Sequence, residues 1–275
     1  MFFVLMKRIW LKRTAWILLT PVFIFTLLMI LLYVPPVQSF LRRQAMSIAS
    51  EATGMQISVE RIDLRFPLNL LVRGVLVTQP VDSLGTEKQD TLLNLKSLNV
   101  RIQAWPLLHG QVEVDEVKLE QVSLNSLQLI DGMQVQGELG RFYLESHGVN
   151  LTDEAVVLNQ IELADTRLEV MLADTTEAVP DTTTTPLNWK VNLHTLALDN
   201  VSVALSMPLD SIRMSTRLGK VQLQDAKVDL GKTLYAWRNF QLSDASLHFD
   251  QGTAEPVEGF DASHIALRDI QIGID

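Results

Sequence analysis

A frame of eight residues recurs along this 275-residue chain and constrains its fold more than any other feature. The frame reads apolar, any residue, Leu, any residue, a polar residue, two further residues and a final apolar residue. Six copies are present, and a looser copy at 70–77 has Gly in the polar position. The six copies occupy residues 117–124, 161–168, 196–203, 221–228, 240–247 and 265–272.

The spacing inside the frame predicts β-strands with one apolar face and one irregular point. The first two apolar positions are two residues apart, which places both side chains on one face of a strand. The last apolar position is five residues beyond the Leu, and an odd interval would turn it to the other face. We therefore expect a β-bulge or tight turn at the polar position, where Asp and Asn tolerate turn geometry. The residues at this position are Gln121, Asp165, Asn200, Asp225, Asp244 and Asp269.

The apolar side of these strands predicts a large surface that needs a cover. After Met55 the sequence has no convincing helix, so a mainly β body of one-sided strands is expected. A sheet buries its apolar face on a second sheet, by closing into a barrel, or on a ligand. The frame places one Leu per copy on the floor of that face. These are Leu119, Leu163, Leu198, Leu223, Leu242 and Leu267.

Composition excludes several classes of function. The chain has no Cys and a net charge of −9, and its first 34 residues contain four basic residues and no acidic one. Four positive charges fewer leave −13 on the remainder, which does not suit a nucleic-acid binder. The five histidines have no metal-ligand spacing, and no catalytic motif is present, so we predict a protein without enzyme activity, metal or cofactor.

Two sequence features imitate functional sites. Residues 226–233 fit a relaxed phosphate-binding loop, but they overlap the recurring frame, and Gly231-Lys232 is expected to be its exit turn. The Asp residues of the frame could suggest calcium ligands, but they lack the dense Asp, Asn and Gly runs of calcium-binding repeats. Turns explain both features better.

The N-terminus predicts a membrane anchor. Residues 15–34 contain no charge and are long enough to cross a bilayer as a helix. Trp16 and Tyr33 lie near its ends, where aromatic rings prefer the interface, and Pro21 is expected to kink the helix modestly. A cleaved signal peptide is the alternative, but Pro35-Pro36 follows in place of a small-residue cleavage site. The basic residues that should hold the N-terminus in the cytoplasm are Lys7, Arg8, Lys12 and Arg13.

Three further segments organise the rest of the chain. Residues 37–54 predict a short amphipathic helix that ends at Gly54, lying on the membrane surface or capping the open end of the sheet. Residues 80–90 and 174–186 are polar and are expected to be loops. The strand pattern continues to the last residue, so we expect the chain to continue in a longer parent protein.

The chain resembles the AsmA-like family, and most closely the N-terminal portion of its TamB-type translocation and assembly proteins. The resemblance rests on the anchor ending in Pro35-Pro36-Val37, the helix through Gly54, the stretch 65–75, and the segment 95–124 with its Trp105-Pro106 turn. It implies an elongated, open, taco-like β-groove in the periplasm, apolar inside. It also implies phospholipid transport, or assembly of outer-membrane proteins with a barrel partner. The family's C-terminal domain, which would meet that partner, is absent from this chain.

These observations divide the chain into a cytoplasmic basic segment (1–14), a transmembrane anchor (15–34), an amphipathic helix (37–54) and a periplasmic β-groove domain (55–275). We predict a single-pass protein of the bacterial inner membrane whose groove shelters phospholipid acyl chains in outer-membrane biogenesis. One alternative is a scaffold for assembly of outer-membrane or secreted proteins, which would bind clients along a strand edge. Another is a closed β-sandwich that serves as an interaction module.

Overall fold

A computed structural model shows the fold of the chain. It describes residues 39, 43–44, 46–47, 50, 53–65, 68–83, 86–103, 105–106, 113–126, 132–150, 154–172, 188–252 and 258–273. The predicted anchor (15–34), with Trp16, Pro21 and Tyr33, lies outside these residues, as do the basic residues before it and the polar segment 174–186. The described part of 37–54 is helical, and Gly54 follows it with φ +68°.

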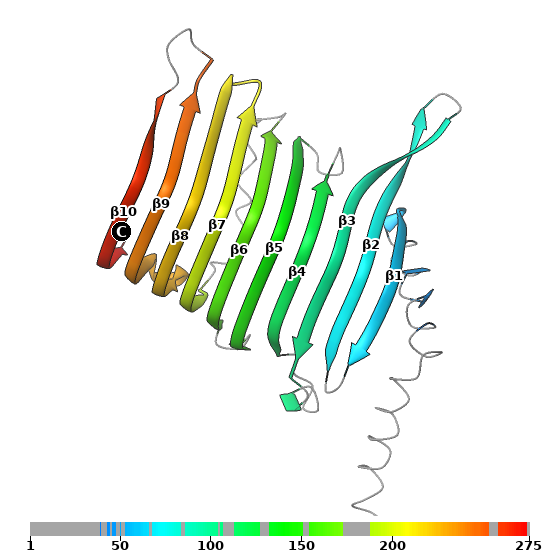
Figure 1. Ribbon diagram of the computed structural model, residues 1–275, viewed down its shortest axis with the longest axis horizontal. Coiled ribbons are helices and arrows are strands. Elements are labelled where there is room, and N and C mark those ends of the chain that lie inside the picture. Colours follow the sequence, from blue (N-terminus) through cyan, green and yellow to red (C-terminus); the bar gives the residue numbers. More distant parts are fainter. Residues whose placement is uncertain are drawn as a thin grey trace, which may run out of the picture.

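The described residues form one sheet of ten strands, and Figure 1 shows them side by side in chain order. This confirms the mainly β prediction and shows that the sheet is open, because β1 and β10 each pair with one strand only. The strands are β1 (Gln56–Arg65), β2 (Asn69–Ser83), β3 (Thr86–Ile102), β4 (Val114–Asn125), β5 (Met133–Asn150), β6 (Ala155–Leu172), β7 (Lys190–Met207), β8 (Ile212–Asp229), β9 (Leu234–Asp250) and β10 (Glu258–Gly273).

Neighbouring strands are antiparallel except β6 and β7, which run parallel. The chain must therefore return along the length of the sheet between Leu172 and Lys190. β8 and β9 are joined by η1, a 3-10 turn at Leu230–Lys232. The Asp229 side chain accepts a hydrogen bond from the Lys232 N–H at 3.1 Å. The segment that imitates a phosphate loop is thus a strand followed by a short turn, and no helix opens there.

The polar loop predicted at 80–90 is wrong. β2 extends to Ser83 and β3 begins at Thr86, with Pro80 paired to Gln89 and Asp82 paired to Glu87. Only two residues, one of them Gly85, separate the strands, and such a length is typical of a hairpin connection. Polar composition did not prevent strand formation, because ladder pairing satisfies the backbone donors and acceptors.

Every strand kinks at one row of positions that crosses the sheet. At these positions the ladder skips one residue on each strand, and the paired residues on either side stay in register. We call this the first kink row. It consists of Glu60, Gly74, Lys96, Gln121, Gly140, Asp165, Asn200, Gly219, Asp244 and Ser263.

Left-handed backbone makes the kinks. Gln121, Asp165, Asn200 and Asp244 have φ of 49° to 54°, and Gly74 has φ 59°. These five residues lie on β2, β4, β6, β7 and β9, which all run in one direction. The left-handed residue takes up the odd interval, so Leu198 and Val201 both stay on the apolar side. The skipped residues match one to one, so this is not a β-bulge with an extra residue on one strand.

A second kink row crosses β6 to β10, six residues further along each strand. Its left-handed members are Asp225 on β8 and Asp269 on β10, with φ 50° and 51°, which lie on strands of the opposite direction. The members of this row are Asn159, His194, Asp225, Arg238 and Asp269. All six polar positions of the frame therefore have left-handed backbone, five-strand spacing apart from no common period in sequence but aligned in space.

Glycines make the first kink row close-packed. A Cβ atom on Gly140 would lie 2.8 Å from the Asp165 Cβ, and one on Gly219 would lie 2.7 Å from the Asp244 Cβ. Each glycine faces a left-handed Asp on the next strand, and the backbone oxygens there are also near. The absence of a side chain at these two positions lets the kinked strands stay at ladder distance.

Candidate functional site

The most distinctive surface of this sheet is its apolar face. One row of directly paired residues crosses all ten strands and is apolar at every strand. We call it floor row A. Its members, from β1 to β10, are Ile62, Val72, Leu98, Leu119, Phe142, Leu163, Leu198, Val221, Leu242 and Ile265.

A second complete row, floor row B, lies two residues away along each strand. Its members are Leu64, Leu70, Val100, Val117, Leu144, Ile161, Leu196, Leu223, Phe240 and Leu267. Ten strands at about 4.8 Å spacing make each row roughly 43 Å long. The two rows lie side by side between the kink rows, and they form a continuous apolar band across the sheet.

The six floor leucines of the sequence prediction divide between these rows. Leu119, Leu163, Leu198 and Leu242 belong to row A, and Leu223 and Leu267 belong to row B. The frame missed the other floor residues, among them Phe142 and Val100. Their strands lack the frame, although they share a spacing of three between apolar residues at the kink, as in Leu139 and Phe142. That spacing was the available signal.

No second layer covers this band within the described part of the chain. No large side chain there is fully buried, although Val221, Leu242 and Ala245 form a small cluster with 6–8% exposure. The residues packed against this cluster, such as Leu198 and Ile265, come from the same sheet. Leu267 is 41% exposed. Side chains of the band thus contact their lateral neighbours and leave their outer surface open, and a large contiguous apolar surface of this kind marks a binding site.

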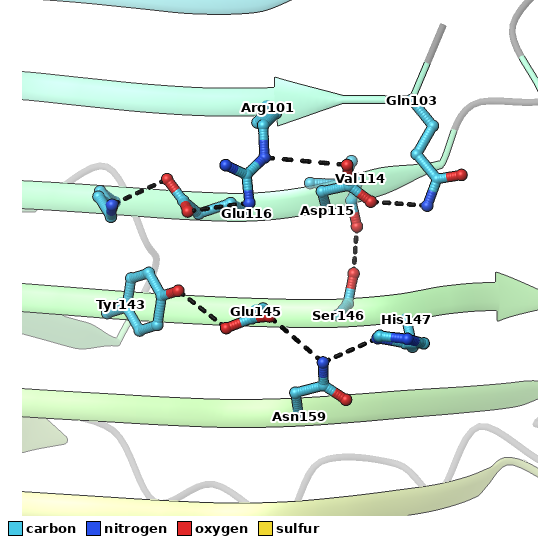
Figure 2. A network of polar contacts seen from close by, with 11 residues as sticks. Arg101, Gln103, Val114, Asp115, Glu116, Tyr143, Glu145, Ser146, His147 and Asn159 are labelled. Carbon is cyan, nitrogen blue, oxygen red and sulfur yellow. Dashed lines mark hydrogen bonds and ion pairs between the residues drawn. The ribbon is translucent and has the colours of Figure 1, made fainter. Parts of the chain in front are cut away.

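The opposite face is polar and internally bonded. Figure 2 shows its network on β3 to β6. Arg101 and Lys118 contact the Glu116 carboxylate at 3.1 and 2.9 Å, and the Arg101 Nε is 3.8 Å from Asp115. The Ser146 hydroxyl donates to the Val114 carbonyl. Glu116 is only 7% exposed, so its two cationic partners compensate a charge that has lost most of its water.

Two histidines lie close to the second kink row on this polar face. The His194 Nδ1 is 2.6 Å from Asp225 Oδ1, and the Arg238 Nη1 is 2.7 Å from Asp225 Oδ2. The Asn159 side chain is 2.7 Å from His147 Nδ1. These residues are up to 91 positions apart in sequence, so their spacing carried no signal. Their contacts link neighbouring strands, and His194 and Arg238 are both about 70% exposed.

Hydrogen bonds on the polar face also shift two ionisation equilibria. The Tyr143 hydroxyl donates to Glu145 at 3.0 Å, and the Asn159 amide donates to its other oxygen at 3.3 Å. These two bonds, led by that from Tyr143, lower the pKa of Glu145. Burial raises the pKa of Tyr143, and so do the hydrogen bond and the charge of Glu145.

We expect Tyr143→Phe to raise the pKa of Glu145 toward its ordinary value, because the larger of the two hydrogen bonds to the carboxylate is lost. The depressed folded-state pKa means that Glu145 stabilises the fold above its unfolded-state pKa, and that this contribution is lost as the pH falls through the folded-state pKa. NMR titration of the glutamate carboxyl carbons measures the shift. Asn159→Ala serves as comparison and should move the pKa less, whereas an unchanged pKa in the Phe variant would refute the assignment.

Depressions on this sheet follow the first kink row and are shallow and polar. One is lined by Glu60, Lys96, Glu138 and Asp165, and another by Asn200, Lys220 and Asp244 among others. In the part of the chain that the structure describes, no group of three or more His, Asp or Glu side chains could hold a metal ion. The kink-row carboxylates therefore have the role of backbone-adapting and strand-linking residues.

No protein-family model matches the chain, and no curated protein matches it. The resemblance to the AsmA-like family stays a prediction that rests on the residues given above. Within the described ranges, no helix has the length and apolar character needed to span a bilayer. The residues predicted to do so lie outside those ranges.

Proposed function

We propose that the apolar band binds phospholipid acyl chains, and that the protein moves phospholipid between membranes in outer-membrane biogenesis without chemical catalysis. The observation that carries this proposal is the pair of floor rows, which are apolar on all ten strands and have no covering layer among the described residues. The sheet would curve around the chains as an open groove. The predicted inner-membrane anchor at 15–34 would tether it in the periplasm.

The physical chemistry of the band suits this ligand. Transfer of each acyl methylene from water to an apolar surface is favourable by about 0.8 kcal/mol. Floor rows A and B offer such contacts along their whole length, with no buried donor or acceptor that would select one tail over another. Headgroups would remain in water, beyond the edges of the band. Uniform contact from strand to strand also gives no single deep minimum, which favours sliding over trapping.

A second candidate function is a scaffold on which outer-membrane or secreted proteins assemble, with a barrel partner reached through a region beyond this chain. The observation that favours it is the open edge of β10, whose backbone is available for strand addition. Blocking that edge would abolish this function and leave lipid binding intact. A closed β-sandwich interaction module has less support, because the described strands belong to one sheet.

Photo-crosslinking in native membranes tests the lipid proposal. A photoreactive phenylalanine derivative at Leu119, on floor row A, is expected to form adducts with phospholipid. The matched control is the adjacent Lys118, which faces the polar side and is 45% exposed. Mass spectrometry of the labelled protein identifies the adducts. Equal labelling at both positions, or phospholipid labelling at Lys118 alone, would refute the assignment of the lipid-binding face.

A further inference from the structure

The edge strand β10 carries a pattern that no partner within the described sheet uses. β10 pairs with β9 along one side, and its other side has no strand partner among the described residues. It is 16 residues long, and Leu267 and Ile272 on it are 41% and 45% exposed. Long free edges of this kind pair readily with another strand unless Pro, bulges or inward charges protect them. β10 contains no Pro, and its floor positions hold no charged residue.

The sheet reveals a pairing rule for such an edge. In each antiparallel pairing across a kink row, a left-handed residue faces one that is not left-handed, as Asp165 faces Gly140 and Asp225 faces His194. In the parallel pairing of β6 with β7, two left-handed residues face each other, Asp165 and Asn200. An added antiparallel strand must therefore place a left-handed residue opposite Ser263 and an ordinary one opposite Asp269.

β10 satisfies this rule with itself. Its pattern is symmetric about Ala266, because Ile265 and Leu267 are floor residues, Ser263 and Asp269 are kink residues, and Ala262 and Ile270 lie beyond the kinks. A second β10, running antiparallel with Ala266 opposite Ala266, would place each Asp269 against a Ser263. The Ser hydroxyl could donate to the Asp carboxylate, as the His194 ring meets Asp225 within the sheet. Both floor rows would continue without a break.

We propose that two copies of this chain associate through β10, paired antiparallel about a twofold axis at Ala266. The contact is isologous, the closed form of pairing that most homodimers use. A head-to-tail contact of β1 with β10 would be parallel and would set Glu60 against Ser263, neither of them left-handed, a combination that the sheet contains nowhere. The dimer doubles the length of the apolar band, and it stands or falls independently of what the band binds.

Cysteine crosslinking of the full chain in native membranes tests the register. The chain contains no Cys, so Ala266→Cys introduces one thiol, and the axis places it opposite its copy. Directly opposed residues in an antiparallel pair have Cα atoms about 4.5–5.5 Å apart, which a disulfide can bridge. The control is Gln271→Cys, an exposed residue of the same strand. Its two copies would lie ten residues apart, or roughly 33 Å, in this register.

Mild oxidation should convert Ala266→Cys to a covalent dimer on a non-reducing gel at least about tenfold more than Gln271→Cys, since only the first pair is within bridging distance. Combining Asp261→Cys chains with Gln271→Cys chains should restore crosslinking, because the register pairs these positions. Monomer at Ala266→Cys overturns the proposal, whether its thiol reacts freely with maleimide, which indicates an open edge, or is protected, which indicates that another strand covers β10. Lipid adducts at Leu119 are read separately and report on the proposed function alone.

Discussion

Gly140→Ala should lower the free energy of unfolding by about 1–3 kcal/mol, the usual cost of forcing a methyl into a packed position. The new Cβ would lie 2.8 Å from the Asp165 Cβ and 3.1 Å from the carbonyl oxygens of Ala164 and Asp165. Two of these three atoms belong to the backbone, so a side-chain rotation cannot relieve the contact. The strands would have to separate at the first kink row, where the ladder already skips a residue.

Gly137→Ala is the matched control, because it changes the same residue type on the same strand. Its Cβ would meet a flexible atom, the Leu168 Cδ1, at 3.3 Å, and the Arg167 carbonyl oxygen at 3.4 Å. A glycine inside a strand costs about 0.5–1 kcal/mol relative to Ala, so this change should be neutral or slightly stabilising. Denaturant unfolding of the full chain, followed by circular dichroism, compares the two. Equal stability of both variants would show that the kink row tolerates side chains and would contradict the close packing described above.

Leu163→Asp should reduce the phospholipid bound to the protein at least about tenfold, because an ionised carboxylate against acyl chains costs several kcal/mol. Leu163 lies in floor row A between Phe142 and Leu198, in the middle of the sheet. The sheet itself should still form, since the band is open and the new carboxylate can reach water. Lipid extracted from the purified full chain and quantified by mass spectrometry gives the occupancy.

Leu163→Ala is the control for lost volume in this experiment. It removes a similar part of the side chain and keeps the floor apolar, so its lipid occupancy should stay near that of the unmodified chain. Glu162→Asp, on the polar side of the same strand, should have no effect. If Leu163→Ala and Leu163→Asp lose lipid to the same extent, packing and not polarity governs occupancy, and the acyl-chain floor is wrong.

The sequence carries the local part of this architecture. An odd interval between apolar residues, with Asp or Asn inside it, marks a position where the strand must reverse its side-chain alternation. The structure resolves that requirement with left-handed backbone at Asp165 and its equivalents. Asp and Asn adopt this conformation more readily than most residues do, whereas Gln121 adopts it against its preference. A bulge and a left-handed kink satisfy the same spacing, so the pattern could not choose between them.

Register between strands was beyond reach of the sequence. The copies of the frame are unevenly spaced, and strands without the frame, such as β5, lie between them. Only the ladder shows that Phe142 joins Leu119 to Leu163 in one row. The parallel pairing of β6 with β7 depends on how the chain between them returns, which local patterns do not encode. The same holds for the contact of His194 with Asp225, because it exists only once β7 and β8 are in register.

The most direct test of the account is to measure phospholipid in the unmodified full chain. The protein would be purified in a lipid-free detergent and washed until a single-span membrane protein treated in parallel retains no phospholipid. The account predicts phospholipid in at least stoichiometric amount after organic extraction, held on the apolar band. A folded protein that carries no more phospholipid than the single-span control would contradict it, and would favour the strand-addition scaffold as the function of this sheet.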